Sequence, residues 1–305
     1  MKNIILDVDT GIDDALAIAY AIHSPELNIL GITTSFGNTT VSEATKNTLQ
    51  LLDTIGVKIP VIPGVSKKFN GEDPREKTVT IHGNNGIGEA TLSPAVSKPH
   101  EMLAHDFIIS AIHQHPNDIT ILTTASQVNL AEAVKKDPNI IPLVDEVLVM
   151  GGAISVPGNI TPYAEANIYT DTEAAQFTFS SGLPITLVGL DVTTKTLLKR
   201  DVLKKWKKKN SSLAHVLAEA CEFYMDAYAR VEPELNGCAL HDPLTVGIAI
   251  DSSFVQTAPM HVDVLIEGSK AGQTLGKKAS KNTNINVCLD VESNRFVTHF
   301  LNRIV

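Results

Sequence analysis

Asp7-Val8-Asp9-Thr10-Gly11-Ile12-Asp13-Asp14 decides the fold, and this octapeptide lies between two apolar runs. The run before it, residues 3–6, has the length and β-branched content of a buried parallel strand. The run after it, residues 15–19, has a helix-forming composition, with no breaker before Ser24-Pro25. In an open parallel α/β sheet, a strand-to-helix turn lies at the carboxyl edge of the strand, where such folds bind ligands. The octapeptide therefore predicts a strand, a ligand-binding turn and a helix.

Four carboxylates crowd this one turn, and their repulsion has to be offset. Two unit charges 4 Å apart repel by roughly 4 kcal/mol at an effective dielectric constant of 20. A helix N-terminus stabilises a nearby negative charge by only about 0.3–1 kcal/mol. A hard cation is the economical explanation, and all-oxygen ligation favours Ca²⁺ or Mg²⁺. Capping is the structural alternative, but it accounts for only one or two of the four acids.

The composition limits the class of protein and its partners. With 305 residues, of which 43% are hydrophobic and 19% charged, the chain is long enough to bury a sizeable core. A formal net charge of -9 argues against binding to nucleic acid or to an anionic membrane. The three cysteines have neither metal-ligand spacing nor a disulfide pattern, which favours a reducing cytoplasm. Acids interrupt the first apolar segment, so we expect neither a signal peptide nor a membrane span there.

Predicted strands alternate with predicted helices along most of the chain, which indicates right-handed βαβ units. The region 65–99 has no sustained periodicity, and so long an irregular segment is usually functional or mobile. The part from about 192 to 250 is more helical and is expected to close the pocket. Strands are expected at 27–34, 58–62, 118–123, 144–150, 184–190, 260–267 and 283–290, and helices at 41–55, 101–115, 128–136, 171–180, 212–230 and 291–304. We expect a single α/β domain over residues 1–305, with a mainly parallel, Rossmann-like central sheet flanked by helices and an active site at the C-terminal edge of the strands.

Polar side chains follow several of the predicted strands. Asn38 comes after the second strand, and Asn159, Glu165 and Asn167 come after the strand that ends at Met150. An amide supplies both a donor and an acceptor, and a carboxylate accepts two bonds, so this set suits vicinal hydroxyls. A sugar, or a nucleoside bound through its ribose, fits these residues better than a phosphate ester. Any single Asn could instead cap a turn.

With these residues in place, the chain resembles the nucleoside hydrolases, the inosine-uridine preferring ribonucleoside N-ribohydrolases. The resemblance runs from Asp7 to about Asp251, and its signature is the octapeptide followed by Ala15. The supporting matches are Gly37-Asn38, His82-Gly83 with Gly86-Ile87-Gly88, Met150-Gly151-Gly152-Ala153, Gly158-Asn159, Glu165-Ala166-Asn167-Ile168-Tyr169 and His241-Asp242-Pro243-Leu244.

The resemblance implies Ca²⁺-dependent hydrolysis of ribonucleosides to ribose and free base, in nucleoside salvage, by a homodimer or homotetramer. It implies that Ca²⁺ is bound by Asp9, Asp14, Asp242 and the backbone carbonyl of Val128. Asp9 would be the general base, and His241 would face the leaving base. The residues implied to bind the substrate are Asp13, Asn38, Met150, Asn159, Glu165, Asn167, His82, Tyr224 and Tyr228. The chain departs from the family at Ala125-Ser126-Gln127-Val128-Asn129, where Gly-Pro-Leu-Thr-Asn is usual.

Two other functions remain open from the residues. A haloacid dehalogenase-type phosphatase would use Asp7 as its nucleophile with Mg²⁺, and would need a second acidic pair. Gly189-Leu190-Asp191 comes nearest to that pair but lacks the following acid. If Asp7 is not the nucleophile, we expect it to bond turn amides. The other function is that of a noncatalytic nucleoside or ribose binder, which would have no need for the metal acids together with His241.

Overall fold

The computed structural model describes residues 1–231, 233–279, 283 and 285–305. Strand β1 (Lys2–Val8) and helix α1 (Ile12–Ile22) flank the acidic turn, as the sequence predicts. Helices cover both faces of β1, so its apolar residues divide between two buried clusters: Leu6 belongs to one and Ile5 to the other. This explains why the strand is apolar throughout rather than alternating.

Within the described residues, nine strands form one sheet in the order β10-β9-β11-β6-β5-β4-β1-β2-β3. Every neighbouring pair from β11 to β3 is parallel, and β9 and β10 add an antiparallel edge. The strands are β2 (Leu27–Thr34), β3 (Val61–Pro63), β4 (Ile119–Thr123), β5 (Glu146–Met150), β6 (Ile185–Val188), β9 (Val255–Val264), β10 (Thr274–Lys278) and β11 (Ile285–Val291), with β7 (Leu197–Lys199) and β8 (Gly237–Ala239) paired separately. The expected α/β fold is confirmed. Chain order reverses between β1 and β4, and such a switch point is where open α/β sheets bind ligands.

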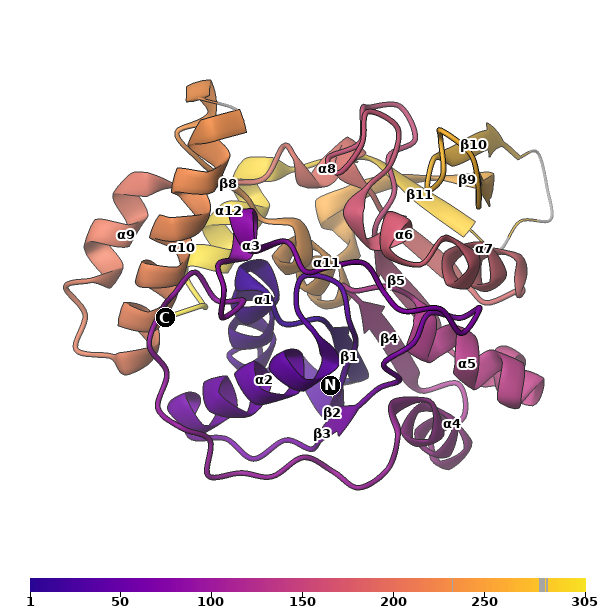
Figure 1. Cartoon of the computed structure of the whole chain (residues 1–305), viewed down its shortest axis with the longest axis horizontal. Helices are drawn as coiled ribbons and strands as arrows, with labels where there is room; N and C mark the ends of the chain where they lie inside the picture. The colour runs from indigo at the N-terminus through magenta and orange to yellow at the C-terminus, as the bar shows by residue number, and fades with distance from the viewer. Residues whose placement is uncertain (232, 280–282, 284) are drawn as a thin grey trace.

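Two layers of helices enclose the sheet (Figure 1). One layer holds α1, α2 (Val41–Ile55), α10 (Ser212–Val231), α11 (His241–Ile250) and α12 (Ser293–Leu301). The other holds α4 (Ala104–Gln114), α5 (Val128–Lys136) and α7 (Thr172–Ser180). The shorter helices are α3 (Val79–His82), α6 (Ala166–Thr170), α8 (Leu190–Thr193) and α9 (Arg200–Trp206), with 3₁₀ turns η1 (Pro138–Leu143), η2 (Pro233–Leu235) and η3 (Ser252–Phe254).

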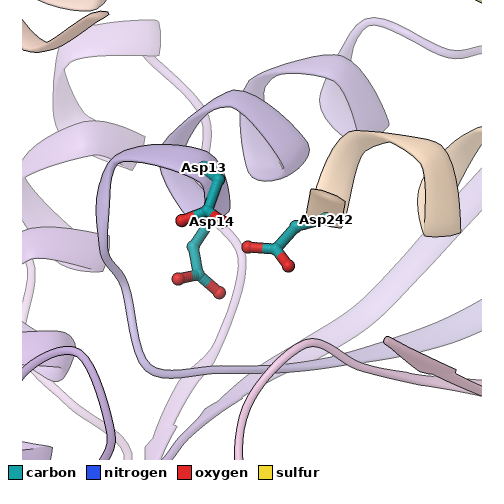
Figure 2. A group of neighbouring side chains, drawn as sticks. All are labelled: Asp13, Asp14 and Asp242. Atoms are coloured by element: carbon teal, nitrogen blue, oxygen red, sulfur yellow. The ribbon is translucent and has the colours of Figure 1, made fainter. Parts of the chain in front are cut away.

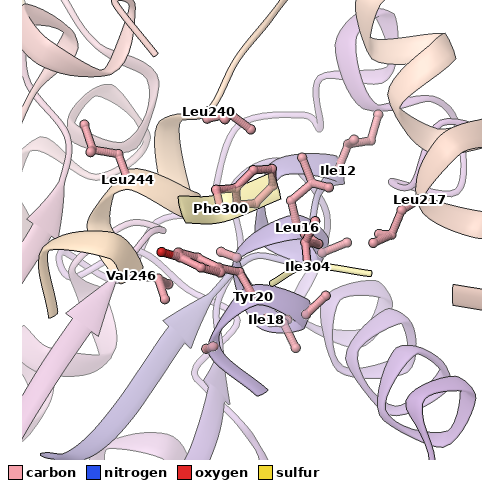
Figure 3. Close-up of a cluster of buried hydrophobic side chains, with 14 of the residues drawn as sticks. Ile12, Leu16, Ile18, Tyr20, Leu217, Leu240, Leu244, Val246, Phe300 and Ile304 are labelled. Atoms are coloured by element: carbon pink, nitrogen blue, oxygen red, sulfur yellow. The ribbon is translucent and has the colours of Figure 1, made fainter. Parts of the chain in front are cut away.

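The larger buried cluster fixes the two ends of the chain against each other (Figure 3). Ile12, Leu16 and Tyr20 recur every fourth residue of α1, and all three are fully buried. Phe300 of α12 packs edge-on against Tyr20, with ring centroids 5.3 Å apart, and Leu244 of α11 joins the same cluster. Because α11 packs on α1, residues at the two helix starts are brought together across most of the sequence.

The C-terminal part differs most from the expected elements. The strand expected at 260–267 is β9, which begins at Val255 and ends at Val264, and β10 follows it although the sequence did not predict it. The strand expected at 283–290 includes residue 284, which lies outside the described residues, and β11 begins at Ile285. Across the described part of the chain, no helix is both long and apolar enough to cross a membrane.

Candidate active site

The candidate site lies at the switch point between β1 and β4, where α1 begins. The backbone N–H of Gly11, the N-cap residue, donates to Asp14 Oδ2 at 2.8 Å. Thr124, the first residue after β4, donates its hydroxyl to Asp14 Oδ1, also at 2.8 Å. Both oxygens of Asp14 are therefore bonded by residues that follow the two strands of the switch point.

Three carboxylates meet here from opposite ends of the sequence (Figure 2). Asp13 and Asp14 come from the first turn of α1, and Asp242 reaches toward them from the first turn of α11. One oxygen from each lies within 4.8 Å of the others. All three are almost fully buried, and neither Asp13 Oδ1 nor Asp242 Oδ2 has a hydrogen-bond partner within the described structure. Buried carboxylate oxygens without partners are costly, so the cluster fits a bound cation.

The pKa values show the cost of burying these carboxylates, to which repulsion between them adds for Asp14 and Asp242. Burial raises the pKa of Asp13 and of Asp14 to about 6. Burial and the charges of Asp13 and Asp14 raise the pKa of Asp242 well above its usual range. A divalent cation would offset both the cost of burying these charges and the repulsion between them. An all-oxygen donor set is the one that hard cations prefer.

Asp9 sits beside this cluster, on the loop that follows β1. Its two oxygens accept hydrogen bonds from the backbone N–H of Asn38 at 2.5 Å and from the Asn38 side-chain amide at 3.0 Å. Burial, followed by the charge of Asp14, raises the pKa of Asp9 well above its usual range. Asn38 thus orients Asp9, and the low-dielectric surroundings make Asp9 a stronger base than an exposed aspartate.

Gly37 leaves the space that Asp9 occupies, which gives a first prediction. A Cβ at residue 37 would lie 1.9 Å from Asp9 Oδ2, so Asp9 would have to move. We expect Gly37→Ala to lower kcat by about 10²-fold, the typical effect of misplacing a catalytic group by about 1 Å. Gly56→Ala is the control: residue 56 has a φ of 85° and open space around it, so that change costs stability but not turnover. Equal kcat for Gly37→Ala and wild type would show that this Asp9 position is not needed.

The acid cluster and Asp9 form one wall of the site, and a second wall comes from β5 and α6. Glu165 caps α6, accepting from the backbone N–H groups of Asn167 and Ile168, and also accepts from Gly152 N–H. The Asn167 amide donates to the Thr124 carbonyl at 2.9 Å and contacts Met150 Sδ at 3.2 Å. The structure thus brings together the predicted residues Met150, Glu165 and Asn167. Asn159 is exposed at the edge of this group, and its side-chain oxygen accepts from Ala166 N–H.

A third wall is aromatic and comes from α3, α10 and α11. Tyr224 contacts Asp13 through its hydroxyl, at 3.4 Å, and its ring lies 5.5 Å from that of His82. Tyr228 and His241 form a hydrogen bond of 2.7 Å through His241 Nε2, and His241 Nδ1 lies 2.8 Å from Thr193 Oγ1. Burial lowers the pKa of both His82 and His241 to about 4, so both rings are neutral at pH 7.

Val128 is the first residue of α5, and its side chain is fully buried. It packs in a small apolar cluster with Phe36, Ala131 and Ala174. An apolar side chain suits this position, and a carbonyl ligand does not depend on the side chain. Its role as a metal ligand stays a prediction.

Asp7 and Asp191 are placed away from the cluster. Asp7 accepts from the Thr33 hydroxyl at 2.6 Å and the Asn129 amide at 2.8 Å. The expectation that it bonds turn amides is therefore wrong: Asp7 lies inside β1, so its partners are side chains of β2 and α5. Asp191 accepts from the backbone of Ile154 and Ser155 and so holds a loop. This arrangement lacks the acidic constellation of a haloacid dehalogenase-type phosphatase.

Three residues at the site were not predicted from the sequence: Thr124, Thr193 and Arg75. The Thr124 hydroxyl binds Asp14, and its position just after a strand was a usable signal. Arg75 lies in the region 65–99, where no periodicity indicated which side chain faces inward. Its Nε donates to Thr170 Oγ1 of α6, and its Nη1 donates to Thr78 Oγ1.

Comparison with known families decides among the remaining functions. The family model described as inosine-uridine preferring nucleoside hydrolase matches residues 4–298. The chain belongs to this family. As a nucleoside hydrolase it is a hydrolase enzyme, so the phosphatase and the noncatalytic binder are both set aside.

Relatives of this nucleoside hydrolase match it over nearly their full length. Uridine nucleosidase 1 of Arabidopsis thaliana is 36% identical over 93% of this chain and 84% of its own. The pyrimidine-specific ribonucleoside hydrolase RihA of Salmonella arizonae is 30% identical over 99% of this chain and 97% of its own. Among solved structures, the purine-preferring ribonucleoside hydrolase from Gardnerella vaginalis is 37% identical, with a TM-score of 0.95 over 99% of this chain and 98% of that one.

Proposed function

We propose that this enzyme hydrolyses the N-glycosidic bond of ribonucleosides, giving ribose and free base, with Ca²⁺ as its cofactor. The observation that carries the proposal is the buried cluster of Asp13, Asp14 and Asp242 at the switch point, with Asp9 beside it. Asp9, Asp14, Asp242 and the carbonyl of Val128 would hold the ion. When bound, Ca²⁺ would supply positive charge that orients the ribose hydroxyls and the attacking water.

Asp9 is the general base in this proposal. Cleavage develops positive charge on the ribose, as it does in other glycoside hydrolysis, and the buried carboxylates stabilise that charge. Asp9 takes the proton of the attacking water, since Asn38 holds its carboxylate in place. Asp13, Asn38, Asn159, Glu165 and Asn167 bind the ribose hydroxyls, with Met150 beneath the sugar.

The aromatic wall serves the leaving base. A nucleobase leaves poorly as an anion and has to gain a proton. The hydrogen-bonded row Thr193, His241 and Tyr228 supports a proton relay to the departing base. The Tyr228 hydroxyl gives its proton to the base, His241 Nε2–H passes a proton to the Tyr228 oxygen, and His241 Nδ1 takes one from the Thr193 hydroxyl, so His241 stays neutral. Water returns the last proton to Thr193 after the base departs. Tyr224 and His82 contact the base from the same side.

The relay gives a prediction that depends on the leaving group. We expect His241→Gln to lower kcat for natural nucleosides by about 10²-fold, the lower end for loss of general acid catalysis. p-Nitrophenyl riboside has a leaving group that departs readily as an anion, so its cleavage should change only severalfold. Parallel rates of base and nitrophenol release measure the difference, and equal losses for the two substrates would exclude His241 from the relay.

The function itself is tested with a panel of nucleosides. Purified enzyme is assayed for reducing sugar with each nucleoside and with a phosphomonoester, before and after chelation and after return of Ca²⁺. We expect sugar release from ribonucleosides only, lost on chelation and restored by Ca²⁺. Nucleoside binding by calorimetry without base release would contradict the proposal.

The panel also identifies the preferred base. The relatives include uridine, pyrimidine-specific and purine-preferring enzymes, so their names do not choose one for this chain. We further propose one domain over residues 1–305 in which the part from about 192 to 250 closes the pocket. The enzyme would act in cytoplasmic nucleoside salvage as a homodimer or homotetramer, and light scattering measures its assembly.

A further inference from the structure

Arg75 is a cation that joins two walls of an otherwise acidic site. Its guanidinium donates to Thr170 at the end of α6 and to Thr78, just before α3, at 3.3 and 2.9 Å. Glu165 and Asn167 lie on the first of these helices, and His82 lies on the second. Figure 1 shows the segment between β3 and α3 crossing the carboxyl edge of the sheet before it reaches α3, which packs on α10.

The charges that act on Arg75 show that its guanidinium lies near the site. Burial lowers its pKa, while the charges of Asp9 and Glu165 raise it. The charge of Arg75 in turn lowers the pKa of His82. The guanidinium is therefore within electrostatic reach of all three walls. Two of its nitrogens hold the protein, and Nη2 has no partner among the described residues, so it is available to a ligand.

The three walls leave one part of a ribonucleoside for Arg75. The vicinal hydroxyls suit the acid cluster, and the base suits the side of Tyr228 and His241. The remaining polar group of the ribonucleoside is the 5′-hydroxymethyl group, and the remaining part of the site is the one that contains Glu165 and Arg75. A cation beside C1′ would oppose the positive charge that develops there, so it belongs at the far end of the sugar.

We propose that Arg75 donates a hydrogen bond from Nη2 to the 5′-hydroxyl oxygen and so makes this hydroxyl a determinant of substrate choice. The inference rests on the proposed ribonucleoside hydrolysis. The hydroxyl would donate its own proton to Glu165, because a hydroxyl can do both at once. A 5′-phosphate would bring negative charge close to Glu165, and the single charge of Arg75 would not offset both, so nucleotides are rejected.

The test compares substrates that differ only in this hydroxyl. Uridine is paired with 5′-deoxyuridine, and inosine with 5′-deoxyinosine, in wild type and in Arg75→Met. A hydrogen bond from a charged donor corresponds to roughly a tenfold to hundredfold loss of kcat/KM. We expect that loss in Arg75→Met for the 5′-hydroxyl substrates, mainly through KM, and less than threefold change for the 5′-deoxy substrates.

Lys77→Met is the matched control on the same segment. The Lys77 ammonium binds Glu43 and the Asn84 carbonyl, so its removal should leave the ratio between the paired substrates unchanged. Calorimetry with methyl β-D-ribofuranoside and its 5-deoxy analogue, both fixed as furanosides, gives a second readout that does not need turnover, and wild type should bind the 5-hydroxyl furanoside more tightly by the same factor.

The possible results separate the inference from the proposed function. Equal losses for both members of a pair, with active wild type, would overturn the role of Arg75 and leave the hydrolase in place. Better cleavage of uridine 5′-monophosphate than of uridine would also overturn it, in favour of a phosphate site. Wild type that cleaves no ribonucleoside and binds both furanosides equally would overturn both.

Discussion

Asp9→Asn should lower kcat by about 10³-fold, within the 10²–10⁴-fold range typical of general base catalysis. Asparagine has the volume of aspartate, and its carbonyl oxygen can still accept from the Asn38 backbone N–H. It cannot take a proton from water, so turnover should fall while the fold remains. Initial rates with the best nucleoside of the panel measure kcat, and circular dichroism with a thermal scan checks the fold.

The matched control is Asp7→Asn, two residues earlier. Asp7 is fully buried, and its carboxylate is bonded to Thr33 and Asn129 rather than to a member of the acid cluster. We expect it to keep kcat within severalfold of wild type even if Tm falls. The reverse pattern, with Asp7→Asn inactive and Asp9→Asn active on the nucleoside, would remove Asp9 as the base.

The parts of the fold that could be predicted from sequence are those set by local patterns. β1 and α1 followed from an apolar run, an acidic turn and a second apolar run, because strand and helix composition act over a few residues. The parallel sheet followed from the alternation of the two kinds of element. β10 was missed because its pairing with β9 depends on partners that no local pattern specifies.

The site residues divide in the same way, into those that local sequence patterns predict and those that depend on tertiary structure. Asp13 and Asp14 were placed by their own turn, whereas the approach of Asp242 was known only through the family resemblance. The structure gives its physical cause, the packing of α11 on α1 around Leu244 and Leu16. Thr193 and Arg75 could not be predicted because each acts through a side-chain contact that depends on tertiary structure.

Asp242→Asn is expected to change metal-free and Ca²⁺-loaded protein in opposite directions. Without metal, the clustered charges of Asp13, Asp14 and Asp242 destabilise the fold, so removing one should raise Tm by a few degrees. Ca²⁺ at 100 times its Kd should raise the free energy of unfolding of wild type by about 2.7 kcal/mol. For a chain of this size that is a rise in Tm on the order of 5 °C. The variant should lose this rise, because Asp242 is one of the proposed ligands.

Asp226→Asn is the control, since Asp226 is an exposed acid on α10 paired with Arg200. It should keep the Ca²⁺-dependent rise in full. A variant Asp242→Asn that is less stable than wild type without metal, and that Ca²⁺ still stabilises, would contradict both the repulsion and the ligand role.

The pH dependence tests the cost of burying these acids in their charged form without metal. Asp13 and Asp14 have folded pKa values of about 6, above those of unfolded aspartate, so the folded protein binds more protons between the two values. Metal-free wild type should therefore lose stability as pH rises from about 4 through 6, and Asp242→Asn should lose less. Ca²⁺ competes with these protons, so its stabilising effect should shrink as pH falls below 6. Thermal scans across pH, with and without Ca²⁺, distinguish a shared cation site from acids that merely cap a helix, for which stability would instead rise with pH.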